Sequence, residues 1–200
     1  QNVINLGAQE DVTDVSQVPY VVTGGLGAGG YACVMRVEHR ESREPFAMKV
    51  HSKAALRKSK DRQRLARELR IMIDMPVCPF LLHCHAAFET ETDVFFVLDL
   101  IEGGDLFYHL ATQMQGGDGR ICGLPEDKAR GILSEVVVAL QHFHKHGMIH
   151  RDVKVENIML DARGHVKLVD YGLACELAEE GGGSPTQPMS PMGSLIYMPP

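Results

Sequence analysis

The first half of the chain carries the pattern of strands joined by turns. Residues 20–50 alternate glycines with β-branched and aromatic residues, and the strongest strand candidates are 33–37 and 46–50, separated by a polar turn. Residues 94–100 are short, apolar and aromatic, as in a buried strand. Residues 1–18 are polar and weakly patterned, so we expect an N-terminal tail there.

Residues 61–75 change to a helical period. Leu65, Leu69 and Met72 fall on one face, with arginines and a glutamate between them. Asp61 is the expected N-cap, because a carboxylate there can accept a hydrogen bond from a backbone N–H of the first turn. The pattern therefore predicts an amphipathic helix between the second and third strand segments.

The second half of the chain is mainly helical by the same criterion. A helix is expected from about 105 to 113, and a longer one begins at Pro125, is followed by two acids, and stops at Gly147. Short strands at 158–160 and 166–169 flank a turn. The apolar stripe of the long helix comprises Ala129, Ile132, Leu133, Val136, Val137, Leu140 and Phe143.

Composition narrows the class of protein. With 200 residues, 44% hydrophobic and 23% charged, the chain has the make-up of an ordinary soluble globular protein. A net charge of −6 gives no reason to expect nucleic-acid binding, although residues 51–70 carry an excess of basic side chains. The five cysteines include no CxxC pair, and no secretory leader or membrane-length apolar run is present, so we expect reduced thiols and a cytoplasmic location that can extend to the nucleus.

The most informative segment is the run His-Arg-Asp-Val-Lys-Val-Glu-Asn at 150–157, followed by Asp170-Tyr171-Gly172. It places an Asp, a Lys and an Asn on one loop and a second Asp beyond a short strand. This pattern resembles the catalytic loop and metal-binding loop of a protein kinase. A polar turn with scattered charges fits poorly with these residue types at this spacing. In the resemblance Asp152 orients the substrate hydroxyl and accepts its proton, Lys154 neutralises the transferring phosphoryl group, and Asn157 and Asp170 hold Mg²⁺.

The glycine cluster at 24–30 can be interpreted in two ways. Gly25, Gly27 and Gly30 match the fingerprint of a dinucleotide-binding fold, which requires a helix next. In the other frame residues 26–34 resemble the glycine-rich loop of a kinase, with Ala32 where kinases usually have a third glycine. A plain flexible hairpin is the simpler alternative. The residues that would contact ATP in the kinase frame are Leu26, Gly27, Ala28, Gly29, Gly30 and Val34.

Two further charges take defined places in the kinase frame. Lys49 lies on the second strand, where the resemblance puts the lysine that holds the α- and β-phosphates of ATP. Glu68 lies centrally in the next helix and would pair with Lys49. Each alone is an ordinary surface charge.

Residues 20–200 resemble a eukaryotic-type Ser/Thr protein kinase catalytic domain, most like the AGC group. Lys154, two residues after Asp152, is the Ser/Thr form of the loop. The resemblance implies a two-lobed α+β fold. Finer cues lie at 46–49, 79–81, 87–91, 103–107 and 164–168. The implied division is a tail at 1–18, a kinase domain at 19–200, a small antiparallel β lobe at 19–98, a hinge at 99–102, a mainly helical large lobe at 103–200, and an activation segment at 170–200.

The resemblance also implies roles for single residues. Leu98 would be the gatekeeper, and the hinge backbone at Asp99 and Ile101 would pair with adenine. Ala47 and Met159 would sandwich the base. Ser190 aligns with the activation-loop phosphosite, and its phosphate would pair with Arg151 and the basic helix at 57–70. Glu156 completes the residues expected to contact ATP, and Met72, His150 and Tyr171 those expected in an internal hydrophobic spine.

The implied function is transfer of the ATP γ-phosphoryl group to Ser or Thr of protein substrates, with ATP and Mg²⁺ as cofactors and an upstream kinase as activator. The alternative is a pseudokinase, a scaffolding or ATP-binding module, because Ala32, Tyr171 and Pro199 depart from the usual pattern. The segment 193–200 resembles the end of the activation segment, and the helices that follow it in kinases are absent, so we expect a partial, incomplete large lobe.

Overall fold

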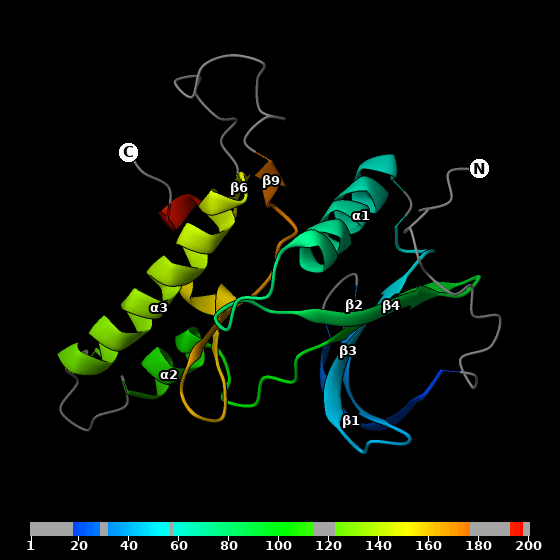
Figure 1. Ribbon diagram of the computed structural model, residues 1–200, viewed down its shortest axis with the longest axis horizontal. Helices are drawn as coiled ribbons and strands as arrows, with labels where there is room; N and C mark the ends of the chain where they lie inside the picture. Colours follow the sequence, from blue (N-terminus) through cyan, green and yellow to red (C-terminus); the bar gives the residue numbers. More distant parts are fainter. Residues whose placement is uncertain (1–17, 29–31, 57, 114–122, 177–192, 198–200) are drawn as a thin grey trace, which may run out of the picture. The chain divides into compact units, whose positions relative to one another are not determined.

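The computed structural model describes residues 18–28, 32–56, 58–113, 123–176 and 193–197. They divide into two compact units (Figure 1). The first contains the chain up to Asp74 together with His83–Leu100, and the second contains Met75–Leu82 together with the chain from Ile101 onward. We describe each unit by itself.

The first unit is built on one antiparallel sheet. Its five strands lie in the order β1-β2-β3-β5-β4 (Figure 1). The predicted strands at 33–37 and 46–50 are confirmed and are longer than expected. The strands are β1 (Tyr20–Ala28), β2 (Ala32–His39), β3 (Pro45–Ser52), β4 (Cys84–Glu89) and β5 (Asp93–Leu98).

Alternation along these strands separates the face that forms an apolar core from the opposite face, which carries Lys49. Met48 on β3 lies opposite Met35 on β2 and Val97 on β5, on the face that forms the core. Val18, the last residue of the expected tail, is also buried in this core. Residues one position along β3, including Lys49, point to the opposite face. The core cluster comprises Val18, Val37, Phe46, Met48, Phe88, Phe95 and Val97.

Helix α1 (Ser59–Asp74) buries the predicted face, with Leu65, Leu69 and Met72 all buried. The predicted N-cap is wrong. The helix begins at Ser59, and the backbone N–H of Asp61 already donates to Lys58 O at 3.0 Å. Asp61 therefore lies inside the first turn, where its carboxylate is still near the positive end of the helix dipole.

The segment Met75–Leu82 belongs to the second unit, although the expected small lobe at 19–98 included it. Hydrogen bonds explain the difference. The N–H of Leu82 donates to Leu168 O at 3.1 Å, and the N–H of Leu168 donates to Phe80 O at 2.9 Å. These backbone hydrogen bonds attach the segment to Leu168, which lies in a short hairpin of the second unit.

Two helices of the second unit begin and end where the sequence predicts. Helix α2 (Leu106–Gln113) is capped by Asp105, whose carboxylate accepts a hydrogen bond from the N–H of Tyr108 at 2.7 Å. Helix α3 (Glu126–Lys145) starts directly after Pro125. Gly147 follows its end with φ +71°, a left-handed conformation that favours glycine.

The predicted stripe on α3 is too broad. Ile132, Val136 and Phe143 are buried, but 62% of Leu133 and 51% of Val137 are exposed. The buried positions recur at helical spacing on one narrow face, together with Ala139. Leu133 and Val137 lie about 100° further round the helix, and no described element covers them.

Short elements complete the second unit. None of its helices, nor α1, is long and apolar enough to span a membrane, within the part of the chain that the structure describes. The predicted hairpin at 158–160 and 166–169 is confirmed. The elements are β6 (Met148–Ile149) paired with β9 (Cys175–Glu176), β7 (Ile158–Leu160) paired with β8 (Val166–Leu168), and the 3₁₀ turns η2 (Val155–Asn157) and η3 (Leu195–Tyr197).

Candidate active site

In the first unit, the face of the sheet opposite the core cluster carries an ion pair. Lys49 on β3 donates to Glu68 Oε1 on α1 at 2.7 Å. The side chains are 23% and 9% exposed, so water screens the pair only in part. The predicted pairing of the two residues is present, and it joins the middle of β3 to the middle of α1.

The strand register places other expected ATP contacts on the same face as this ion pair. Val34 lies directly opposite Lys49, and Ala47 lies opposite Leu98. Because side chains two apart on a strand share a face, Ala47 and Lys49 point the same way. Ala47 and Leu98 are buried, and Val34 is half-buried.

The glycine-rich segment is a strand pair. Gly27 lies on β1, and a Cβ added there would meet no atom within 4 Å, so packing within the chain does not require glycine at this position. The space beside its backbone is open, as a phosphate-contacting loop needs. Leu26 and Ala28 also lie on β1, whereas Gly29 and Gly30 lie outside the described residues.

Two points about this segment follow. The strand β2 comes next, and no described helix opens there, so the dinucleotide-binding interpretation does not fit. Ala32 lies on β2 and does not have a positive φ, so alanine at this position meets no backbone strain.

In the second unit, one carboxylate is the centre of a dense hydrogen-bond network. Asp152 is 7% exposed. Lys154 Nζ donates to its Oδ2 at 2.7 Å, and Asn157 Nδ2 donates to the same oxygen at 3.0 Å and to the Asp152 backbone oxygen at 2.9 Å. Asp152, Lys154 and Asn157, which the sequence puts on one loop, are therefore brought together.

Ser194 is a member of this network that the sequence analysis missed. Its hydroxyl donates to Asp152 Oδ1 at 2.9 Å, its backbone N–H donates to the same oxygen at 3.1 Å, and Lys154 Nζ donates to its Oγ at 3.2 Å. The spacing of 42 residues between Ser194 and Asp152 hides the contact from local patterns. The available signal was the place of Ser194 in the segment 193–200, which resembles the end of a kinase activation segment.

The network sets the charge of the loop. Burial by itself would raise the pKa of Asp152, but the hydrogen bonds from Lys154 and Ser194 and the charge of Lys154 outweigh it and bring that pKa below its ordinary value. The hydrogen bond to Asp152 raises the pKa of Lys154. Asp152 is thus an anion and Lys154 a cation at neutral pH.

His150 holds the backbone of this loop. It is 1% exposed, its Nε2–H donates to Val169 O at 3.2 Å, and its Nδ1 accepts the backbone N–H of Asp152 at 3.3 Å. These bonds fix the neutral tautomer, and burial lowers the pKa of His150. The ring packs edge-on against Phe143 and Tyr171.

Asp170 and Tyr171 follow the hairpin. Asp170 is exposed and has φ +64°, which is a strained conformation for a residue other than glycine. Tyr171 is 2% exposed, and its hydroxyl donates to Leu82 O and Leu168 O, each at 3.1 Å. The hydroxyl that distinguishes Tyr171 from the usual phenylalanine is therefore satisfied.

The donor set suits a magnesium ion. Asn157 uses its Nδ2 on Asp152, which leaves the amide oxygen to accept a cation. Asp170 offers an exposed carboxylate, and among the residues that the structure describes its Oδ1 accepts one hydrogen bond, from the N–H of Gly172 at 3.2 Å. Mg²⁺ is typically bound by one or two protein oxygens together with substrate phosphates, and the described residues contain no larger metal-binding group.

The structure places the other residues predicted to contact ATP or to form the hydrophobic spine, and the predicted phosphosite lies outside the described residues. Asp99 uses its carboxylate inside the first unit, accepting the N–H of His83 at 3.2 Å and contacting His85 Nε2 at 2.8 Å. Ile101 and Met159 are half-buried residues of the second unit, and Glu156 is exposed. Met72 belongs to the first unit and His150 and Tyr171 to the second, so the spine stays a prediction. Ser190 lies outside the described residues.

Comparison with known proteins agrees with this geometry. The chain is 37% identical over 161 residues to an atypical protein kinase C of Drosophila melanogaster, covering 80% of this chain and 25% of that protein. It is 36% identical over 161 residues to the serine/threonine-protein kinase Sgk1 of Danio rerio, covering 80% and 35%. It is 38% identical over 178 residues to a putative ribosomal protein S6 kinase alpha-1 of Caenorhabditis elegans, covering 88% and 21%.

These relatives are AGC-group kinases, and the chain spans about a third or less of the length of each. A match to the description "Protein kinase domain" extends over residues 20–200, which include every site residue described above. The chain belongs to the protein kinase domain family.

Proposed function

We propose that this chain is the catalytic domain of an ATP-dependent Ser/Thr protein kinase. The observation that carries the proposal is the network around Asp152, in which Lys154, Asn157 and Ser194 all donate to one buried aspartate. A scaffolding module does not need a carboxylate held in this way. No specific observation favours the pseudokinase alternative.

Asp152 positions the acceptor in this proposal. Ser194 shows that Asp152 Oδ1 can accept a hydroxyl hydrogen bond at 2.9 Å, so a substrate Ser or Thr hydroxyl can be oriented by the same carboxylate. Because its pKa is lowered, Asp152 is a weak base, and its main contribution is to align the hydroxyl and take the proton late. Lys154 lies beside it and neutralises charge on the transferring group.

The nucleotide contacts are proposed residue by residue from the family resemblance. Lys49, held by Glu68, is proposed to contact the α- and β-phosphates, and Val34, Ala47, Leu98 and Met159 to enclose the base. Asn157 and Asp170 would hold Mg²⁺. When bound, the metal neutralises phosphate charge and so favours displacement at the γ-phosphorus.

Regulation and partners follow as further parts of the proposal. The substrates are proteins with Ser or Thr acceptors, and an upstream kinase would modify Ser190. The resemblance implies basic partners for such a phosphate, with Arg151 the first candidate. We place the protein in the cytoplasm and also in the nucleus. Mass spectrometry of the cellular protein tests the modification of Ser190, because finding Ser190 always unmodified contradicts it. Cell fractionation tests the proposed location.

The reaction itself is tested by incubating the full-length protein with γ-labelled ATP, Mg²⁺ and a mixture of peptides with Ser, Thr or Tyr as the sole acceptor. The proposal predicts label on Ser and Thr peptides that disappears when EDTA removes the metal. Transfer to Tyr peptides alone, or ATP binding with no transfer after Ser190 phosphorylation, would overturn it.

A further inference from the structure

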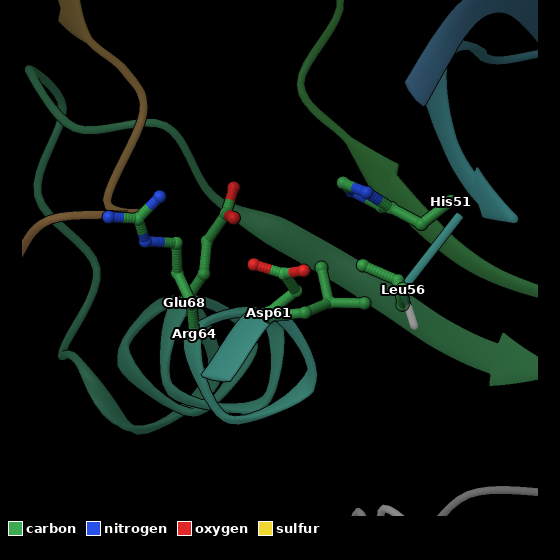
Figure 2. A pocket seen from close by; sticks show the side chains of 6 residues that line it. His51, Leu56, Asp61, Arg64 and Glu68 are labelled. Carbon is green, nitrogen blue, oxygen red and sulfur yellow. The ribbon is translucent and has the colours of Figure 1, made fainter. Parts of the chain in front are cut away.

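A pocket that shares Glu68 with the predicted site lies within the first unit, where β3 faces α1. It encloses a cavity of about 180 Å³ (Figure 2). A water molecule takes about 30 Å³ in the liquid, so the space can admit a small organic molecule. The lining residues are His51, Leu56, Asp61, Arg64, Leu65 and Glu68.

His51 indicates that this pocket needs a polar occupant. The residue is only 6% exposed, and its Nε2 is buried with no hydrogen-bond partner among the described residues. Such an atom costs about 1–3 kcal/mol when it stays unpaired, so a partner from outside the chain is expected. Burial and the charge of Lys49 lower the pKa of His51 to about 4, and the neutral ring can accept one hydrogen bond at Nε2.

The charges around His51 narrow the kind of partner. Figure 2 shows the Asp61 carboxylate between the Leu56 and Glu68 side chains, and the Arg64 guanidinium on the far side of Glu68 from His51. Glu68 Oε1 already binds Lys49 at 2.7 Å, so this carboxylate is paired within the chain. No described side chain makes an ion pair with Asp61. Leu56 and Leu65, both buried, add apolar wall.

We propose that this pocket binds a small molecule with a flat apolar body and an amidinium or ammonium head. The head would donate to Asp61 and to His51 Nε2, and the body would lie against Leu56 and Leu65. An anion of the same shape at the His51 end of the pocket would meet the Asp61 carboxylate and should be rejected. Since Glu68 lines the pocket and also holds Lys49, the occupant would lie beside the ion pair without replacing either partner.

Benzamidine and benzoate test this proposal, because they have nearly the same shape and opposite charges. The full-length protein, labelled with ¹³C on its histidine rings, is titrated with each compound and followed by NMR. We expect benzamidine to shift the His51 ring signal in a saturable way, with benzoate leaving it unchanged. The readout does not depend on kinase activity.

Two matched variants on the same helix locate the binding. Asp61→Asn keeps the side-chain size and removes the charge in the pocket, and should weaken benzamidine binding about tenfold or more. Asp74→Asn removes an exposed charge at the other end of α1 and should leave binding unchanged. Equal binding to the wild type and Asp61→Asn, binding of benzoate as strong as that of benzamidine, or no shift of His51 would each overturn the proposal.

Discussion

At the scale of single residues, His51 makes the stability of the first unit depend on pH. Its pKa is about 4 in the folded state and about 6.5 when unfolded. Between these values the unfolded chain binds more protons, so the free energy of unfolding must fall as the pH falls. We predict that urea denaturation shows a loss of roughly 2 kcal/mol between about pH 7 and pH 5 from this residue.

The variant His51→Leu isolates this effect from the other titrating groups. It removes the imidazole and should flatten the pH dependence over the same range. An unchanged slope in the variant would show that the ring takes up its proton equally well in the folded protein.

Tyr171 departs from the family pattern, which usually has phenylalanine at this position, and the structure explains how its hydroxyl is accommodated. Its hydroxyl donates to two backbone oxygens, one on the segment Met75–Leu82 and one on β8. Tyr171→Phe should therefore lower the free energy of unfolding by about 1 kcal/mol. The control Tyr108→Phe, at a position 61% exposed, should change it by less than about 0.5 kcal/mol. Equal effects of the two variants in chemical denaturation would contradict this account.

At the scale of elements, the turn before Ser194 is fixed by Gly193. Its φ is +115°, and a Cβ there would lie 2.4 Å from Arg151 O. Gly193→Ala must shift this backbone and with it the hydroxyl and N–H that bind Asp152. We predict a fall in kcat of roughly 10- to 100-fold, because misplacement by about 1 Å has effects of this size.

Gly131 provides the matched control. It lies inside α3, and a Cβ there would meet nothing within 4 Å. Gly131→Ala should keep the wild-type kcat and raise the free energy of unfolding by roughly 0.5–1 kcal/mol. A Gly193→Ala enzyme with the kcat of the Gly131→Ala enzyme would show that the turn does not position Asp152.

Elements with local signals were predictable, and elements defined by distant contacts were not. Strands β2 and β3 follow from alternating residues, and the start of α3 follows from Pro125 and the acids after it. The predicted cap at Asp61 was wrong because residues before it already form the helical turn. The segment Met75–Leu82 joins the second unit through pairing with β8, a partner that lies more than 80 residues away and that no local pattern indicates.

At the scale of the whole molecule, the candidate site likewise combines residues that have local sequence signals with residues defined by distant contacts. The contact between Lys49 and Glu68 was predicted because the order of these residue types along the chain matches the kinase pattern, and the same pattern put Asp152, Lys154 and Asn157 on one loop. The roles of these residues and of Asp170 in the reaction stay predictions. The contact of Ser194 could not be predicted, since Ser194 lies 42 residues beyond Asp152 and no local pattern joins the two. The width of the α3 stripe was also overestimated, because apolar character alone does not say which residues another element covers.

The central claim is that Asp152 carries the transfer of a phosphoryl group to Ser or Thr. The most direct measurement compares the transfer rate of full-length wild type, Asp152→Asn and Asp127→Asn, the last an exposed acid in the first turn of α3. We predict a fall of about 10²–10⁴-fold for Asp152→Asn. Asp127→Asn should keep the wild-type rate. Equal rates in all three proteins would contradict the account, since the network around Asp152 would then play no part in the reaction.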